Sequence, residues 1–367
     1  MPYTYEDVIP YGEKDTSGCG LIGFIHRDGR KEDGNNIIRA IEHMRERGNG
    51  LGGGFAVYGL YDSYKDHYAI HMMYDNNDAR KQTETFIKTS FAVDLEEQIP
   101  TRPNKHIKNP PLFYRYFCKI PETYLQFQEP DDYVREKVIY INKYMNGSFV
   151  LSSGKNMGAF KGVGEAHDIG NFFRLDEYKA HTWIAHSRFP TNTPGWWGGA
   201  HPFTMLNYSV VHNGEISSYG INRRYLESFG YECSMRTDTE VVAYGVDLLR
   251  RRHKLPWKAV AAVFASRFWK DIDKLSPEEK ELHIRLRASY GGLLFNGPFA
   301  FIIGFEGGFM AIADRGKLRP MVVGYKGDSV YVSSEESSIR LIQPDLDRVW
   351  HPRAGEPVFA FLKGYEE

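Results

Sequence analysis

One cysteine stands where a nucleophile could act without a partner side chain. Cys19 follows the small residues Thr-Ser-Gly (16–18) and begins the apolar run CGLIGFI, which has the length and β-branched content of a strand. Cleavage after Gly18 would give Cys19 a free α-amino group, which titrates near pH ~8 and accepts the thiol proton when neutral. One residue would then supply both nucleophile and base. The competing interpretation is a buried, small hydrophobic residue.

Two other patterns imitate functional sites but lack the context those sites require. GNGLGG (48–53) satisfies G-x-G-x-x-G, yet it follows a helix-like segment and opens a strand, the reverse of a dinucleotide fingerprint. His67 and His71 have the i,i+4 spacing of a zinc helix, but they lie in strand-like HYAIHMMY without the H-E-x-x-H glutamate. We therefore expect neither a nicotinamide or flavin site nor a metal site here.

A set of short segments follows Cys19 in a defined order. The segments are RERGNGLGGGFAVYG (45–59), HSRFPTNT (186–193), GGAHPF (198–203), VVHNGEISSY (210–219), RTDTEVVAY (236–244) and ADRGKLRPMVVGYKGDSVYVSSEESSIRLI (313–342). HNGE alone is weak, because any turn can contain it. Together the segments resemble the class II glutamine amidotransferases, whose fold is that of the N-terminal-nucleophile hydrolases. The wording HSRFPTNT is closest to glutamate synthase, and the chain resembles the stand-alone amidotransferase subunit of archaeal-type glutamate synthase.

The resemblance implies roles for six further residues. Arg188 would hold the α-carboxylate of glutamine with its planar fork of donors, and Asp238 would hold the α-ammonium group. The remaining four are the oxyanion hole, Asn213 and Gly214, and two neighbouring pocket positions, Thr191 and His201. The competing interpretations are a structural ion pair for Arg188 and Asp238 and an ordinary hairpin turn for HNG.

The elements that must position these residues mix helices with short strands. Helical patterns cover 35–47, 79–89, 131–145, 221–229 and 238–251; the strand patterns include 19–25, 54–61, 67–74, 113–120, 148–153, 181–189 and 208–214, with five more in the final third. We expect strand 67–74 to pair with strand 54–61. The alternation predicts an α+β fold, and the resemblance implies a four-layer αββα sandwich of the N-terminal-nucleophile hydrolase type. Residues 1–18 are predicted to be a leader that is removed, and 19–367 one amidotransferase domain with an insertion-rich stretch at about 76–180.

Composition excludes several classes of function. The 367 residues carry a formal charge of −1, which argues against a dominant nucleic-acid surface. The longest clean apolar run, Ala259–Ala265, is far shorter than the roughly 20 residues of a membrane span. The N-terminus lacks the apolar core of a secretory signal, and the three cysteines (Cys19, Cys118 and Cys233) make a disulfide framework implausible. We expect a cytoplasmic protein with reduced thiols.

The function implied by the resemblance is hydrolysis of L-glutamine to glutamate and ammonia through a γ-glutamyl thioester on Cys19. Ammonia would pass to a glutamate synthase catalytic subunit, which in the resembling family carries flavin and iron–sulfur clusters. Three scattered cysteines cannot supply the Cys₄ set of a cluster, so we expect no redox cofactor in this chain. The alternatives are an amidotransferase subunit for another acceptor and a non-catalytic, glutamine-binding regulatory subunit. Trp196 and Trp197 are interpreted as a lid over the pocket or as a packed surface turn.

Overall fold

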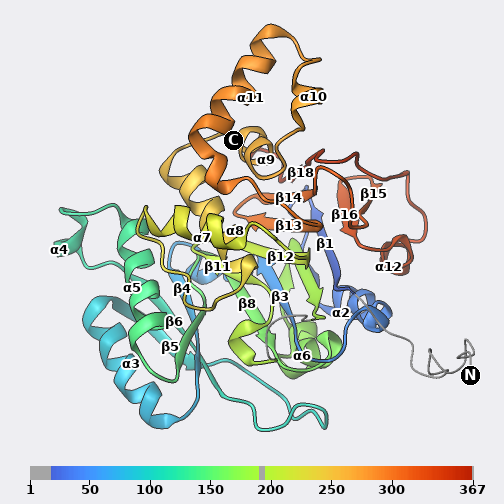
Figure 1. Cartoon of the computed structure of the whole chain (residues 1–367). Helices are drawn as coiled ribbons and strands as arrows, with labels where there is room; N and C mark the ends of the chain where they lie inside the picture. The colour runs from blue at the N-terminus through green and yellow to red at the C-terminus, as the bar shows by residue number, and fades with distance from the viewer. Residues whose placement is uncertain (1–17, 190–194, 366–367) are drawn as a thin grey trace, which may run out of the picture.

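The centre of the molecule is a pair of sheets stacked face to face (Figure 1). The computed structural model describes residues 18–189 and 195–365. The larger sheet has the strand order β17-β15-β16-β1-β10-β3-β8. Its strands are β1 (Gly20–His26), β3 (Gly53–Tyr58), β8 (Met157–Gly162), β10 (Thr182–Ser187), β15 (Val322–Lys326), β16 (Ser329–Ser333) and β17 (Arg348–Trp350). The smaller sheet, in order, contains β11 (Phe203–Met205), β12 (Tyr208–Gly214), β13 (Phe299–Phe305), β14 (Gly308–Ala313) and β18 (Val358–Phe361).

Strand β1 explains why the two sheets stack. Its side chains alternate between faces, as the period of a strand requires. Leu21 and Ile25 join an apolar cluster with Ile302 of the smaller sheet, whereas Ile22 and Phe24 join a second cluster on the opposite face. Because β1 is buried on both faces, its sequence is an almost continuous apolar run.

Helices cover the two outer faces of the sheet pair. Helices α2 (Asn35–His43), α6 (Ala166–Phe172) and α12 (Glu336–Ile342) pack on the larger sheet; α7 (Tyr219–Glu227), α8 (Asp238–Val246) and α9 (Trp257–Phe264) form the layer over the smaller one. Ile37 and Ile41 of α2 reach the cluster that contains Phe24, and Trp257 of α9 stacks on Phe305 with ring centroids 4.2 Å apart. The order helix, sheet, sheet, helix confirms the predicted α+β, four-layer αββα sandwich.

A separate four-stranded sheet, which we call the inserted sheet, lies beside the sandwich. Its strands, in spatial order, are β5 (Ala92–Gln98), β6 (Leu112–Lys119), β4 (Tyr68–Tyr74) and β7 (Ser148–Ser152), and helices α3 (Asn77–Ser90) and α5 (Pro130–Tyr144) pack against it. The predicted pairing of strand 67–74 with strand 54–61 is wrong. Strand β3 is flanked by β10 and β8, which come from later in the chain, so β4 pairs with β6 and β7 instead.

The remaining elements are short or project from the sandwich. Helices α10 (Trp269–Ile272) and α11 (Pro277–Tyr290) extend away from it at the top of Figure 1. The others are β2 (Glu32–Asp33), which pairs with β9 (Lys179–Ala180), α4 (Glu122–Leu125), a π-helical turn at Asp247–Arg252, and 3-10 turns at Arg45–Arg47, Asp62–Tyr64, Leu175–Glu177, Trp197–Gly199 and Gly291–Leu293. In the described part of the chain, none of the helices has the length and apolarity needed to cross a bilayer.

Candidate active site

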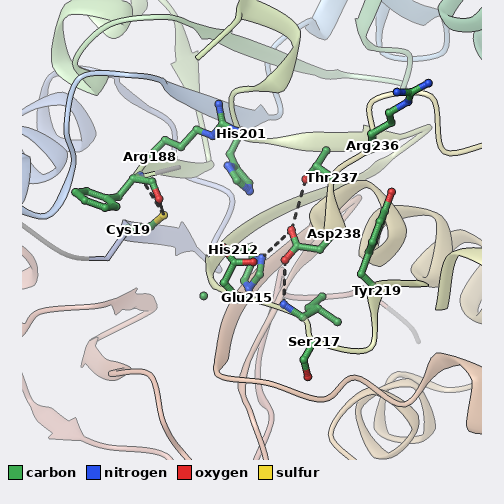
Figure 2. Close-up of a pocket in the computed structure, with 13 residues that line it drawn as sticks. Cys19, Arg188, His201, His212, Glu215, Ser217, Tyr219, Arg236, Thr237 and Asp238 are labelled. Carbon is green, nitrogen blue, oxygen red and sulfur yellow. Dashed lines mark hydrogen bonds and ion pairs between the residues drawn. The ribbon is translucent and has the colours of Figure 1, made fainter. Parts of the chain in front are cut away.

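Strand pairing places Cys19 against the residues that follow β10. Gly20 is the antiparallel partner of Ser187, so Cys19 lies beside Arg188 and Phe189. The Cys19 Sγ accepts the backbone N–H of Phe189 at 3.3 Å, and the residue is only 8% exposed. These residues line a cavity of about 390 Å³, drawn in Figure 2. The predicted nucleophile, Cys19, therefore lines a cavity that is large enough to hold a small molecule.

The surroundings of Cys19 keep its thiol protonated. Burial raises the pKa of the Cys19 thiol to about 11, because a thiolate loses its hydration there. The Phe189 N–H, and then the charges of Arg188 and Arg319, lower this pKa only in part. A nearby base must therefore remove the proton before the sulfur can act as a nucleophile at neutral pH.

Asp238 supplies a buried negative charge to the same cavity. It is the first residue of α8, whose N-cap is Thr237, and a carboxylate is favoured at this positive end of a helix. Its Oδ2 accepts the backbone N–H of Ile216 at 3.0 Å, and its Oδ1 accepts the hydroxyl of Thr239 at 3.2 Å. Burial favours the neutral acid, but His212 and these donors hold the pKa of Asp238 below its ordinary value. The carboxylate is thus ionised at neutral pH.

Arg188 supplies the opposite charge. It follows the last residue of β10 and is 5% exposed, and its side chain lines the cavity (Figure 2). Burial lowers the pKa of Arg188, and the charges of Cys19 and Asp238 oppose that change. A guanidinium keeps its charge even so. A cavity with one cation and one anion matches the carboxylate and ammonium groups of a free amino acid.

Asn213 and Gly214 end β12 next to the Gly18–Cys19 junction. The Asn213 side chain is fully buried; its Nδ2 contacts Ser334 Oγ at 3.4 Å, and its Oδ1 has no hydrogen-bond partner. A side chain built on Gly18 would place its Cβ 3.9 Å from that Oδ1. Gly214 lines the cavity at φ +137°, and a Cβ there would lie 1.9 Å from the Pro298 carbonyl oxygen. Only glycine fits this turn, which leaves the backbone open to the cavity.

His201 belongs to a group of three buried histidines at the cavity: His201 and His212 line it, and His186 packs against His201. The Nε2 of His201 lies 2.8 Å from Thr239 Oγ1, which in turn donates to Asp238, and its ring lies 4.0 Å from that of His186. His212 Nδ1 lies 3.2 Å from the same hydroxyl. Burial lowers the pKa of His186 to about 3 and that of His201 well below its ordinary value, so both rings are neutral. His201 thus supports the carboxylate through a hydroxyl.

Lys161 of β8 anchors the segment that carries His201. Its amino group is buried and donates to the carbonyls of Gly198 and Pro202 at 2.9 and 3.0 Å, and burial lowers the pKa of Lys161 to about 7. Gly54 on the neighbouring strand lets the segment approach, because a Cβ there would lie 2.3 Å from the His201 carbonyl oxygen. The sheet therefore fixes the backbone on both sides of His201.

The structure does not place all the predicted residues in the cavity: Gly214 lines it, but Asn213 is buried next to it and is not a lining residue. Thr191 and the leader residues 1–17 lie outside the described residues. Trp196 and Trp197 are half-buried and do not line the cavity; they contact Phe149 and Phe113 of the inserted sheet, with ring centroids 4.9 and 5.3 Å apart. Their rings pack against this sheet, so the packed turn is the interpretation that the contacts support.

Two arginines near the thiol were missed by sequence reasoning. Arg47 donates from Nε to the Cys19 carbonyl at 3.0 Å and pairs with Glu335 at 3.0 Å. The charge of Arg319 lowers the pKa of the thiol, and its Nε is buried without a hydrogen-bond partner. Both arginines lie in segments that carried the family resemblance, RERGNG and KLRP. Their place in these segments was the sequence feature that could have marked them as site residues.

The patterns set aside from the sequence have structural roles. The 48–53 glycines follow a 3-10 turn and lead into β3, the opposite of a dinucleotide-binding turn. His71 lies within β4, and the described residues contain no group of three or more His, Cys, Asp or Glu side chains that could hold a metal ion. Cys118 and Cys233 are free thiols away from the cavity.

Comparison with known proteins agrees with this geometry. Residues 65–243 match the family model of class II glutamine amidotransferases. An uncharacterized protein of Archaeoglobus fulgidus is 51% identical over 98% of this chain and 96% of its own length. A protein of Methanothermobacter thermautotrophicus, provisionally named a glutamine amidotransferase, is 24% identical over 92% of this chain and 98% of its own length. A glutamine–fructose-6-phosphate aminotransferase of Sulfurisphaera tokodaii is 31% identical, over 29% of this chain and 18% of its own length.

The architecture is that of a four-layer α+β sandwich with a buried thiol at the head of a central strand. The family match covers residues 65–243, the part of the chain that holds Arg188, Asn213, Gly214 and Asp238, and this part is similar to the class II glutamine amidotransferases.

Proposed function

We propose that the protein hydrolyses L-glutamine to glutamate and ammonia through a γ-glutamyl thioester on Cys19. The observation that carries the proposal is the single cavity in which the Cys19 thiol shares walls with Arg188 and Asp238. The two charged side chains would bind the carboxylate and ammonium groups that every amino acid has. The side-chain amide would then extend toward the sulfur, so the cavity would select glutamine by its length.

The chemistry begins with a proton transfer. Removal of residues 1–18 turns the Cys19 amide nitrogen into an amine, whose neutral form takes the thiol proton. The thiolate attacks the glutamine Cδ, and the carbonyl oxygen becomes an oxyanion stabilised by the Asn213 side-chain amide and the Gly214 N–H. The glutamine amide nitrogen takes the former thiol proton from the Cys19 α-amino group, its bond to Cδ breaks, and it leaves as ammonia. Water then attacks the thioester and releases glutamate and the thiol.

Removal of the leader is part of the proposal. An amide nitrogen cannot serve as the base, because its lone pair is delocalised into the peptide bond. Gly18 also lies near the Asn213 amide, because a Cβ built on it would be 3.9 Å from the Asn213 Oδ1. The raised pKa of the thiol makes a base necessary at neutral pH. These three points support maturation at Cys19.

The first experiment combines intact-mass measurement with a glutaminase assay. A mature chain that begins at Cys19 should be active, and Cys19→Ala should lose turnover by at least ~10³-fold because no nucleophile remains. Cys118→Ala and Cys233→Ala are the matched controls and should stay active. Full activity in a chain that still begins at Met1, or in Cys19→Ala, would refute the mechanism.

We further propose that the ammonia passes to a glutamate synthase catalytic subunit. In this proposal the flavin and the iron–sulfur clusters belong to that subunit and not to this chain. The sequence feature that supports this acceptor is HSRFPTNT (186–193). The matching fructose-6-phosphate aminotransferases favour a second candidate, an acceptor of another class. Purification of the native complex, followed by assay of glutamine-dependent glutamate formation from 2-oxoglutarate, distinguishes the two. Activity only with a different acceptor would refute the synthase assignment and leave glutamine hydrolysis intact.

A further inference from the structure

A second cavity, separate from the catalytic one, lies at the base of the projecting α10–α11 pair. It has a volume of about 460 Å³ and shares no lining residue with the cavity that holds Cys19. Its walls come from the segment after α9, the turn after β14 and the loop before β18. The lining residues that matter are Arg267, Phe268, Arg315 and Arg353. We call this space the arginine cavity.

Three guanidinium groups give the arginine cavity a positive charge. The contacts of Arg315 are to neutral groups, the Ser266 carbonyl and the Asn296 side chain. A fourth arginine, Arg287, is close enough that burial and the charge of Arg315 together lower its pKa. Like charges held together in this way are stabilised when an anion binds between them.

Two acids, Asp271 and Glu356, also line the arginine cavity, so three arginines face two carboxylates there. Asp271 pairs with Lys274 at 3.6 Å, one turn along the chain. Glu356 accepts the backbone N–H of Arg353 at 2.7 Å. Asp271 thus has a lysine partner, Glu356 accepts a backbone N–H within the cavity wall, and the three arginines still outnumber the two acids.

The size of the cavity and one aromatic ring narrow the ligand class. Phe268 lines the cavity and is 41% exposed, and the Arg315 guanidinium lies 4.6 Å from its ring centroid. A volume of about 460 Å³ exceeds what a single phosphate fills and suits a small molecule better than a nucleic-acid strand. We propose that the arginine cavity binds a nucleotide, with its phosphates on the guanidinium forks and its base beside Phe268.

A first connection between the arginine cavity and the catalytic cavity runs through Asn296. Asn296 accepts a hydrogen bond from Arg315 on its side chain, and its backbone carbonyl accepts the N–H of Ser217 at 2.8 Å. Ser217 lines the catalytic cavity. A ligand that draws Arg315 toward its phosphates competes with the Asn296 contact. Occupancy of the arginine cavity should therefore change glutamine binding, an effect that rests on the proposed function.

A second connection runs through the turn that carries Arg315. The carboxylate of Asp314 accepts the N–H groups of Gly316 and Leu318 at 2.8 and 2.9 Å, which closes this turn. The next residue is Arg319, whose charge acts on the Cys19 thiol. One short turn thus carries Arg315, which lines the arginine cavity, and Arg319, whose charge acts on the Cys19 thiol.

Binding is tested first and independently of any activity. Calorimetric titration of the full chain with ADP should show binding that weakens as salt rises, and Arg353→Met or Arg267→Met should each weaken it by about tenfold. The control is Arg285→Met, on the exposed face of α11, where Arg285 pairs with Glu281. No binding at millimolar ADP, or equal weakening by the control, would overturn the site. Pyrophosphate is the second probe: if it binds as tightly as ADP, the base contact with Phe268 is refuted.

Coupling is tested in Cys19→Ala, which binds glutamine without consuming it. The dissociation constant of glutamine should change at least ~3-fold when ADP is present, and the change should vanish in Arg353→Met. If ADP binds and the dissociation constant of glutamine does not change, the coupling is refuted, but the nucleotide site in the arginine cavity is not. Failure of glutamine to bind at all, with ADP binding normally, would refute the proposed function instead.

Discussion

Two buried histidine networks, one between the inserted sheet and the sandwich and one in the wall of the catalytic cavity, are built differently. In the first, His71 is fully buried, and both of its ring nitrogens have partners: Tyr61 Oη at 2.7 Å and the Ala159 carbonyl at 3.2 Å. Tyr61 also accepts from Arg115, which pairs with Glu97 at 2.7 Å. The network is closed, as buried polar groups in folded proteins usually are.

The network in the wall of the catalytic cavity is open, in the sense that some of its buried polar atoms have no protein partner. His186, His201 and His212 each have one buried ring nitrogen without a hydrogen-bond partner, and so does the amide oxygen of Asn213. Polar atoms without a protein partner beside a cavity are available to a ligand or to water, whereas in the His71 network the protein itself supplies both partners. Substitutions in the two networks should therefore have opposite consequences.

The largest effect is expected when the negative charge of the cavity is removed. Asp238→Asn keeps the shape of the side chain but loses the charge that would hold the glutamine ammonium group. We expect KM for glutamine to rise ~100-fold, about 3 kcal/mol, with little change in melting temperature. Steady-state kinetics and calorimetry measure this. The matched control is Asp131→Asn beside the inserted sheet, where Asp131 accepts the Tyr68 hydroxyl. This variant should keep the wild-type KM, and an equal rise in KM would contradict the role of Asp238.

A change in the closed network should affect stability and not catalysis. His71→Leu leaves the Tyr61 hydroxyl without its imidazole partner and should lower the free energy of unfolding by roughly 2 kcal/mol at pH 7.5. Urea unfolding measures the loss, and kcat and KM for glutamine should stay at wild-type values. Lost turnover in a variant of normal stability would mean that the inserted sheet takes part in function.

One buried arginine at each place, Arg188 at the cavity and Arg115 in the closed network, allows a conservative comparison. Arg188→Lys replaces a planar fork by a point charge and should raise KM for glutamine about 10-fold, about 1.4 kcal/mol, at unchanged stability. Arg115→Lys makes the same replacement in the closed network and should lower stability without raising KM. If both variants shift KM equally, the carboxylate assignment for Arg188 fails.

The smallest effect is a pH dependence of stability. Burial lowers the pKa of His71 to about 3, with the charge of Arg115 acting in the same direction, whereas the unfolded value is near ~6.5. The unfolded state therefore binds the extra proton first, and the stability that His71 contributes is lost as pH falls below ~6.5. The difference in unfolding free energy between wild type and His71→Leu should shrink by about 1 kcal/mol between pH 7 and pH 5.5. A constant difference would contradict the buried, neutral ring.

Local pattern predicted much of the fold. The strand predicted over 208–214 is β12 with the same bounds, and the helix predicted over 131–145 is α5 within one residue at each end. Side-chain alternation and helix periodicity depend on neighbours in sequence, so a single chain is enough to read them. The partner of β4 was not predictable in this way. Both edges of β3 are taken by strands that lie about 100 to 130 residues later in the chain, so β4 pairs elsewhere.

The sequence by itself determined the candidate nucleophile and the charged residues that should accompany it. Cys19, Arg188 and Asp238 could be named because their motifs occur in one order along the chain. Tertiary structure alone decided which side chains meet: Arg47 and Arg319 at the thiol, Lys161 under the His201 segment, and the tryptophans against the inserted sheet. The physical reason is that burial, charge and hydrogen bonding act through space, and residues far apart in sequence become neighbours only when the sheets stack.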